Sequence, residues 1–241
     1  MKPLVTVITA TTGTHQLYDA LKSIDRQTYS NIEHIVVADG PQFSKQTYAM
    51  TEGSQALVMS LPYNTGADNY NGHRIYGALS YIAKGDYLCF LDQDNWYEDN
   101  HIESMVDVIK QGNDWAYSLR KIVSQEGTYI CNDDCESLGK WKSVLNDNFV
   151  DVNCFMIPKM AAIAFSPFWY RRARHPQEQP EVDRCLSQFM MHHHPKFDTN
   201  GQYTVNYRVA SRHDSVQDVF FIKGNEVMNN RMNGAYPWRK I

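Results

Sequence analysis

The feature that most constrains the fold of this chain is an apolar run that ends in two acidic residues. Tyr87 to Leu91 is apolar and has strand character, and Asp92 and Asp94 follow it one position apart. An apolar run without polar alternation is typical of a central strand of a parallel sheet that is covered on both faces. Open α/β sheets bind ligands at the carboxyl ends of their strands. The two carboxylates therefore suit a hard divalent cation that also holds substrate phosphates, while a solvated turn or a helix cap is the alternative.

The first ninety residues alternate between strand and helix patterns with short links. Such alternation predicts a parallel, doubly wound sheet with right-handed crossovers. The strands are predicted at 4–10, 33–38, 56–61 and 87–91, and the helices at 15–27, at 44–53, and in a segment in which Ile75, Leu79 and Ile82 share a face and Gly85 is the stop.

The second half of the chain is predicted to be mixed. Its elements are a helix at 100–111, a hairpin of 115–123 with 128–131, a strand at 153–157, a helix at 181–192 and a strand at 203–209. No repeat or linker divides the sequence. We predict one α/β domain with two halves, 1–99 and 100–241.

Composition and charge exclude several classes of protein. The 241 residues carry a net charge of −4, which argues against nucleic-acid binding by phosphate neutralisation. No run approaches the ~18 apolar residues of a membrane-spanning helix, and the N-terminal run is too short for a signal peptide. We therefore expect no transmembrane segment, and peripheral membrane contact stays open. The five scattered cysteines predict no disulfide framework and favour a reduced, cytoplasmic setting.

Several familiar motifs are absent from the sequence. There is no Gly-x-x-x-x-Gly-Lys-Ser/Thr, Gly-x-Gly-x-x-Gly, His-Glu-x-x-His or Gly-x-Ser-x-Gly segment. P-loop nucleotidases and common dehydrogenases are thus not supported. Cys131 and Cys135 have a zinc-like spacing, but no second pair follows them.

Polar and small residues gather at the ends of the four predicted strands. Parallel strands bring such residues to one edge of the sheet. An acid after the second strand suits hydrogen bonds to a ribose or a base edge, although Asp39 in Asp-Gly-Pro is also a turn former. The set consists of Thr9, Ala10, Thr11, Asp39, Asn64, Gly66, Asp92 and Asp94.

Four segments in register resemble family 2 glycosyltransferases of the GT-A fold: 4–11, 36–40, 64–66 and 83–95. The resemblance implies a Rossmann-like, mostly parallel sheet with a mixed α+β acceptor half, and a nucleotide-sugar donor. It places the base at Thr9, Ala10 and Thr11, the nucleoside at Asp39, and the donor also near Gly66. Asp92 would contact the ribose or sugar, and Asp94 would hold a Mn²⁺ or Mg²⁺ on the diphosphate.

One basic residue departs from the family pattern. The family often carries Ala-Arg-Asn before its Ala-x-Gly-x-Tyr segment, whereas Arg74 lies two residues earlier than that arginine and Tyr76 is in the expected place. Arg74 is therefore either a diphosphate contact or a surface helix arginine.

The second half resembles the family more weakly. Residues 150–158 resemble the strand that borders the acceptor, and 181–184 resembles the acidic opening of the helix with the catalytic base. A carboxylate is needed there to remove the proton of the acceptor hydroxyl. Asp183 is the first choice and Glu181 the reserve, and the alternative is that both complement the helix dipole.

Histidines and aromatic residues supply further candidates. His192, His193 and His194 precede a proline, where the helix dipole favours solvated histidines. Some GT-A enzymes bring a third metal ligand from the position of His213. Four aromatic residues suit either sugar stacking or the core: Trp96, Trp169, Tyr170 and Trp238.

The resemblance implies metal-dependent sugar transfer from a UDP- or GDP-sugar to a hydroxyl acceptor such as a glycan, with inversion, in polysaccharide biosynthesis. A sugar nucleotidyltransferase is one alternative. Such enzymes usually have a Gly-rich loop with Lys or Arg after the first strand, and residues 11–15 contain neither. A non-catalytic nucleotide-sugar or glycan-binding module is the other, and it would not need Asp183.

Overall fold

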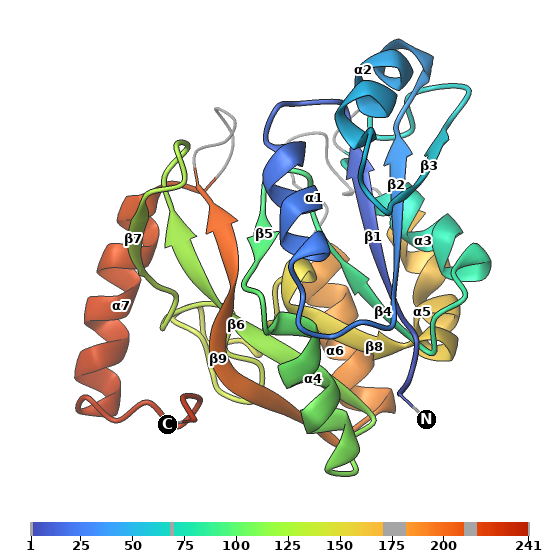
Figure 1. The fold of residues 1–241 in the computed structure, drawn as a ribbon. Helices are drawn as coiled ribbons and strands as arrows, with labels where there is room; N and C mark the ends of the chain where they lie inside the picture. The colour runs from blue at the N-terminus through green and yellow to red at the C-terminus, as the bar shows by residue number, and fades with distance from the viewer. Residues whose placement is uncertain (1, 68–69, 171–181, 210–215, 241) are drawn as a thin grey trace.

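The structure is a computed structural model that describes residues 2–67, 70–170, 182–209 and 216–240. Within them, nine strands form one sheet in the order β3-β2-β1-β4-β8-β6-β9-β5, and β7 pairs with β6 (Figure 1). The strands are β1 (Val5–Thr11), β2 (Ile32–Ala38), β3 (Leu57–Ser60), β4 (Tyr87–Phe90), β5 (Trp96–Tyr97), β6 (Trp115–Val123), β7 (Tyr129–Asn132), β8 (Phe155–Pro158) and β9 (Phe197–Arg208).

The first four strands form the parallel part of the sheet. β1 pairs in parallel with β2 and β4, and β2 pairs in parallel with β3. β1 and β4 are central, and the side chains of Val5, Val7, Leu88 and Phe90 are fully buried. Their near-continuous apolar character thus reflects cover on both faces, which confirms the predicted arrangement of this half.

The second half adds strands in both directions. β8 runs antiparallel to β4 and to β6, while β9 runs parallel to β6 and antiparallel to β5. The predicted hairpin is present as β6 and β7. The sheet is therefore mixed beyond β4, as expected, and β8 joins the two halves.

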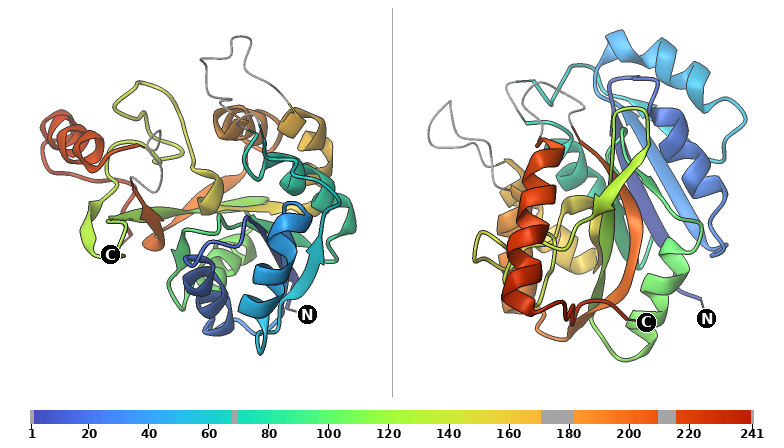
Figure 2. Two further views of the ribbon diagram at one scale, coloured as in Figure 1. Left: turned by 90° about the horizontal axis from the view of Figure 1, so that it is seen from above. Right: turned by 90° about the vertical axis from the view of Figure 1, so that its left-hand side faces the viewer.

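Helices cover both faces of this sheet. Seen from above in Figure 2, α1, α2 and α4 lie on one side of the sheet and α3, α5 and α6 on the other. The helices are α1 (Leu17–Asp25), α2 (Pro41–Thr51), α3 (His73–Ile82), α4 (His101–Lys110), α5 (Lys159–Phe165), α6 (Val182–His193) and α7 (Asp218–Met232), with the short 3₁₀ helices η1 (Val152–Cys154) and η2 (Ser166–Tyr170). No helix in these described ranges has both the length and the apolar character needed to cross a membrane.

Three details differ from the sequence-based expectations. Ile82 is 59% exposed, because α3 buries Ile75, Tyr76 and Leu79 and ends at Ile82. The helices α5 and α7 were not predicted. The last strand begins at Phe197 instead of 203. It pairs with β6 on both sides of the turn-like residues around Gly201 (φ 72°), and the register of the pairing shifts between these two parts.

Gly85 is needed where the chain enters β4. Its N–H donates to Thr6 Oγ1 at 2.9 Å. The Thr6 hydroxyl in turn donates to Glu33 at 2.6 Å. A Cβ on residue 85 would lie 2.6 Å from both the backbone nitrogen and Oγ1 of Thr6. Gly85 therefore permits the close approach of β4 to β1, and it is not the helix stop that the sequence suggested.

We expect Gly85→Ala to lower the free energy of unfolding by about 1–3 kcal/mol, because the added methyl group has no free volume. Urea denaturation measures the change. Lys84→Ala is the matched control, since its side chain is exposed and an exposed substitution changes stability by about 0.5 kcal/mol or less. Wild-type stability of Gly85→Ala would contradict this account of the glycine.

Candidate functional site

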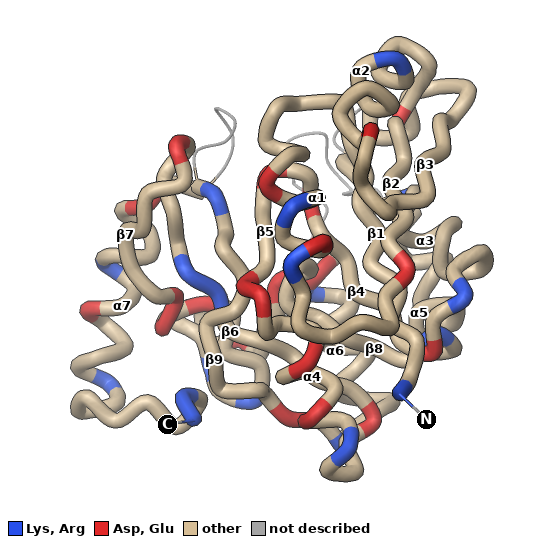
Figure 3. Tube along the Cα trace, viewed as in Figure 1, with Lys and Arg blue, Asp and Glu red and all other residues tan. Residues whose placement is uncertain are grey.

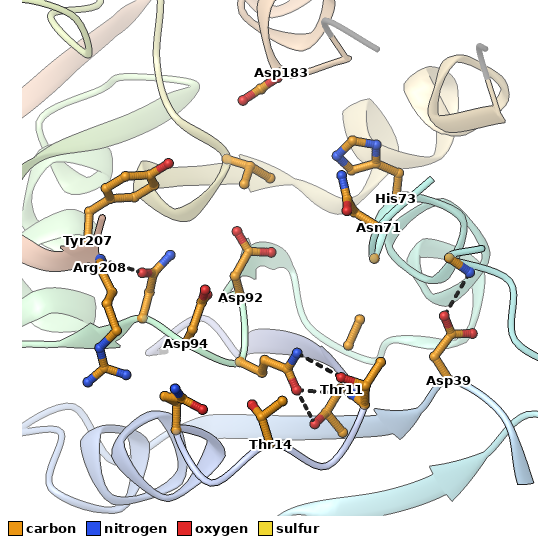
Figure 4. A pocket seen from close by; sticks show the side chains of 18 of the residues that line it. Thr11, Thr14, Asp39, Asn71, His73, Asp92, Asp94, Asp183, Tyr207 and Arg208 are labelled. Atoms are coloured by element: carbon orange, nitrogen blue, oxygen red, sulfur yellow. Dashed lines mark hydrogen bonds between the residues drawn. The ribbon is translucent and has the colours of Figure 1, made fainter. Parts of the chain in front are cut away.

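One cavity opens at the carboxyl ends of β1, β2 and β4. Its volume is about 440 Å³, within the range of small-molecule sites (Figure 4). Both halves of the chain line it. Eight predicted site residues are among the lining residues: Ala10, Thr11, Asp39, Asn64, Gly66, Asp92, Asp94 and Asp183.

Asp92 is held by side chains from two directions. Tyr76 of α3 donates its hydroxyl to Asp92 Oδ1 at 2.6 Å, and Asn153 Nδ2 donates to Oδ2 at 2.9 Å. The backbone N–H of Asp92 donates to Asn153 Oδ1 at 2.7 Å. Burial, together with the neighbouring charge of Asp94, raises the pKa of Asp92 to about 6 despite these hydrogen bonds. The carboxylate is thus oriented firmly in a poorly solvated position.

Gln93 and Asp94, which follow Asp92, have different roles: Gln93 holds a neighbouring loop, and Asp94 lines the cavity. Gln93 Oε1 accepts hydrogen bonds from Thr11 Oγ1 (2.7 Å) and from the Thr12 N–H (3.0 Å), so it secures the loop after β1. Asp94 lies near Asp92 in Figure 4, and it has no hydrogen bond or ion pair to another residue of the described ranges. As far as the described residues go, the Asp94 carboxylate is therefore available to a ligand.

Asp39 closes a loop at the end of β2. Its Oδ1 accepts from the Thr65 N–H at 2.7 Å and from Thr65 Oγ1 at 2.8 Å, and its Oδ2 accepts from the Gly66 N–H at 2.7 Å. A Cβ on Gly66 would lie 2.7 Å from Asp39 Oδ2, which explains the glycine. Asp39 thus shapes the cavity wall in addition to lining it.

Two predicted nucleotide-sugar contacts do not line this cavity. Thr9 is fully buried, and its Oγ1 is 3.0 Å from Nε2 of His34, because its position in β1 turns the side chain into the core. Arg74 stacks its guanidinium 3.4 Å from the ring centre of Tyr70 and donates to the carbonyl oxygen of Thr65 at 3.1 Å. His213 and Glu181 lie outside the described residues.

Asp183 faces Asp92 and Asp94 across the cavity (Figure 4). It lies in the first turn of α6. Burial, reinforced by the negative charge of Asp151, raises the pKa of Asp183 to about 7. Its side chain makes no hydrogen bond to the rest of the described chain. A carboxylate with this pKa in an open cavity is suited to exchange a proton with a bound molecule near neutral pH.

The cavity carries an excess of negative charge. Five aspartates line it, and Arg208 is the sole lysine or arginine among its described lining residues. Arg208 itself donates to Asp19 at 2.9 Å. Figure 3 shows that charges of both signs are spread along the rest of the chain. A ligand with negative charge would therefore be more stable here together with a cation.

No group of three or more His, Cys, Asp or Glu side chains among the described residues is arranged to hold a metal ion. A cation at Asp94 would need additional oxygen ligands from a bound molecule.

The remaining histidine and aromatic candidates lie elsewhere. His192 and His193 lie in the last turn of α6. Of the four candidate stacking residues, Trp169 and Trp238 are buried in the core, whereas Tyr170 is 66% exposed.

Sequence reasoning missed several lining or supporting residues. Asn153 and Asp151 were seen only as part of a segment, and Tyr207 and Arg208 only as part of a strand. Asp-x-Asn at 151–153 was the available signal, since two short polar residues inside an apolar run require buried hydrogen-bond partners.

The family model described as "Glycosyl transferase family 2" matches residues 6–172, more than half of the chain. A glycosyltransferase of Rickettsia typhi is 30% identical over 110 residues, which cover 45% of this chain and 33% of that protein. One of Rickettsia bellii is 27% identical over 135 residues, covering 53% and 19%. The chain thus spans a third or less of the length of these curated relatives.

Solved structures resemble the whole chain. The crystal structure of S. aureus TarS 1–349 matches with a TM-score of 0.64 and 13% identity, covering 96% of this chain and 66% of that one. The structure of the same fragment in complex with UDP-GlcNAc matches with a TM-score of 0.66, again at 13% identity and 96% coverage of this chain, and covers 67% of that one. At this identity the likeness establishes the fold, which confirms the expected GT-A architecture.

We expect Asp39→Asn to lower the free energy of unfolding by about 1–3 kcal/mol, because the amide NH₂ cannot accept the hydrogen bonds of residues 65 and 66. Chemical denaturation measures the loss. Asp25→Asn, at an exposed position, is the matched control. If both variants unfold at the wild-type midpoint, the Asp39 carboxylate does not hold the loop.

Proposed function

The chain belongs to glycosyl transferase family 2, and on this premise we propose that it transfers a sugar from a UDP- or GDP-sugar to a hydroxyl group of an acceptor, with a divalent metal ion and with inversion at the anomeric carbon. The observation that carries the proposal is the placement of Asp183 opposite Asp92 and Asp94 across one cavity. A glycan acceptor, a role in polysaccharide biosynthesis and a cytoplasmic location complete the proposal, and these rest on the family resemblance.

The donor would lie along the edge of the first half, 1–99. Thr11, Asp39 and Gly66 line the part of the cavity that suits the nucleoside. Asp92, held by Tyr76 and Asn153, would accept a hydrogen bond from a hydroxyl of the ribose or the sugar. The S. aureus TarS fragment crystallised with UDP-GlcNAc supports a donor of this class.

The chemistry of the cavity fits a divalent metal ion. Asp94 offers carboxylate oxygens that have no other partner in the described chain, and Mn²⁺ and Mg²⁺ prefer such hard ligands. When bound, such an ion would stabilise the negative charge on the departing nucleoside diphosphate. Asp94 would hold the ion, with His213 as the proposed further ligand.

The acceptor would enter beside Asp183, in the second half, 100–241. Its hydroxyl oxygen attacks the anomeric carbon while Asp183 accepts the hydroxyl proton. The bond from that carbon to the diphosphate oxygen breaks with its electron pair on the leaving group. The placement of Asp183 opposite Asp94 supports attack and departure on opposite faces of the sugar, and therefore inversion.

We expect the protein to release nucleoside diphosphate from at least one UDP- or GDP-sugar in the presence of Mn²⁺ and a hydroxyl acceptor. Asp94→Asn should lower the rate by about a hundredfold or more, because one stabilising contact to developing charge is lost. A coupled nucleotide assay measures both, and Asp25→Asn should retain the wild-type rate. Binding of donor without release under any condition would favour a non-catalytic module.

We expect Asp183→Asn to lower kcat by about 10²–10⁴-fold while donor binding persists, since an amide cannot accept the proton. For the wild-type enzyme, kcat/KM should fall as the pH drops through about 7, because Asp183 with its raised pKa becomes protonated there. Initial rates between pH 5 and 9 and donor titrations measure these effects. Wild-type kcat in Asp183→Asn would remove Asp183 from the base role.

A further inference from the structure

A buried ion-pair cluster lies behind the wall of the cavity. Arg120 of β6 is 1% exposed, and each of its three nitrogens donates to a different carboxylate. Nε bonds to Asp133 at 2.8 Å, Nη2 to Glu136 at 2.5 Å, and Nη1 to Asp151 at 2.5 Å. All three donor groups of this buried cation are thus occupied, which fixes its position closely.

One branch of the cluster leads to Asp92. Asp151 Oδ1 accepts hydrogen bonds from the backbone N–H of Asn153 at 3.0 Å and from its Nδ2 at 2.9 Å. Asn153, which is fully buried, then exchanges two hydrogen bonds with Asp92. The carboxylate of Asp92 is therefore connected to Arg120 through two intervening side chains.

A second branch leads to the helix that bears Asp183. Arg184 is the next residue of α6, and its Nη2 donates to Glu136 Oε1 at 2.9 Å. Its Nη1 is bonded to Asp147, and its guanidinium lies 4.4 Å from the ring centre of Phe149. Glu136 uses one oxygen for Arg120 and the other for Arg184, so it joins the two branches.

We propose that this cluster sets the placement of Asp183 relative to Asp92 across the cavity, and that Arg184 and Asn153 are positioning residues for the transfer reaction. The inference rests on the proposed function, in which Asp92 contacts the donor and Asp183 takes the proton. Reacting groups must be held within about 0.5 Å of their productive geometry. Both arginines are held by several carboxylates, and removing either cation would leave acidic side chains without a positive partner, so the cluster resists displacement.

The same cluster surrounds Asp183 with charge. Asp151 from the segment before η1 and Glu136 from the loop after β7 are negative, and Arg184 on its own helix is positive. Loss of the Arg184 charge would therefore raise the pKa of Asp183. A residue that does not act on Asp183 electrostatically would leave this pKa unchanged.

The test is the variant Arg184→Gln, assayed for transfer alongside the wild type. We expect kcat to fall by about tenfold to a hundredfold, as misplacement of a catalytic group by about 1 Å can produce. KM for the donor should stay within about twofold of wild type, since the donor contacts are untouched. The acid limb of the pH profile, which is the fall in kcat/KM toward low pH, should shift to higher pH.

Arg184→Lys separates geometry from charge and provides a second variant if the first does not fold, as judged by circular dichroism. Lysine keeps the positive charge but cannot bridge two carboxylates in the same plane. We expect a smaller loss of kcat with the acid limb at the wild-type pH.

Arg239→Gln is the matched control. Arg239 pairs with the buried Asp134 at 2.5 Å, and neither residue lines the cavity. This variant should lose thermal stability yet keep the wild-type kcat and acid limb. Wild-type kcat and an unshifted acid limb in folded Arg184→Gln would overturn the inference alone. Absence of transfer by the wild-type protein would overturn the proposed function and the inference with it.

Discussion

The paired hydrogen bonds between Asp92 and Asn153 connect the two halves of the protein where β4 leaves the sheet. β4 is bordered by parallel β1 on one side and by antiparallel β8 on the other. Asn153 lies in η1, two residues before the start of β8, so the register of β8 on β4 brings its amide to both the backbone and the carboxylate of Asp92. A shift in this register would separate the edge proposed to bind the donor from the acid cluster behind it. The cavity, the placement of Asp183 and the Arg120 cluster all depend on this junction.

Electrostatics gives the cavity its chemical character. Five aspartates line it, and burial raises the pKa of Asp92 and of Asp183. An unaccompanied diphosphate would be repelled by this surface, whereas a divalent cation bound with it would offset the repulsion. The same low solvation brings Asp183 into the pH range in which a base exchanges protons efficiently. One physical property, the desolvation of carboxylates, thus supports both halves of the proposed reaction.

Much of the sheet edge that is proposed to bind the donor follows from local patterns in the sequence. Apolar runs ending in Asp39 and in Asp92-x-Asp94 identify strands and their carboxyl ends, and parallel pairing places those ends together. Thr9 shows where this reasoning stops: it is fully buried beside His34, whereas Ala10 and Thr11 line the cavity, and a local pattern does not tell at which residue of β1 the cavity begins. Arg74 shows the same limit for a helix, because its direction depends on the stacking partners Tyr70 and Tyr170, which no local pattern identifies.

Residue periodicity and turn chemistry act over a few positions, and they were sufficient to determine the parallel half of the sheet and the acid pair after β4. The family of the chain was indicated by the resemblance of four short segments, and the family model confirms it. Contacts between distant residues are decided by packing, and no short pattern encodes them. Asn153 meets Asp92 across 61 positions and Arg184 meets Glu136 across 48. Only the tertiary structure therefore decided how Asp92 is held, which charges surround Asp183, and how the two are linked through Arg120.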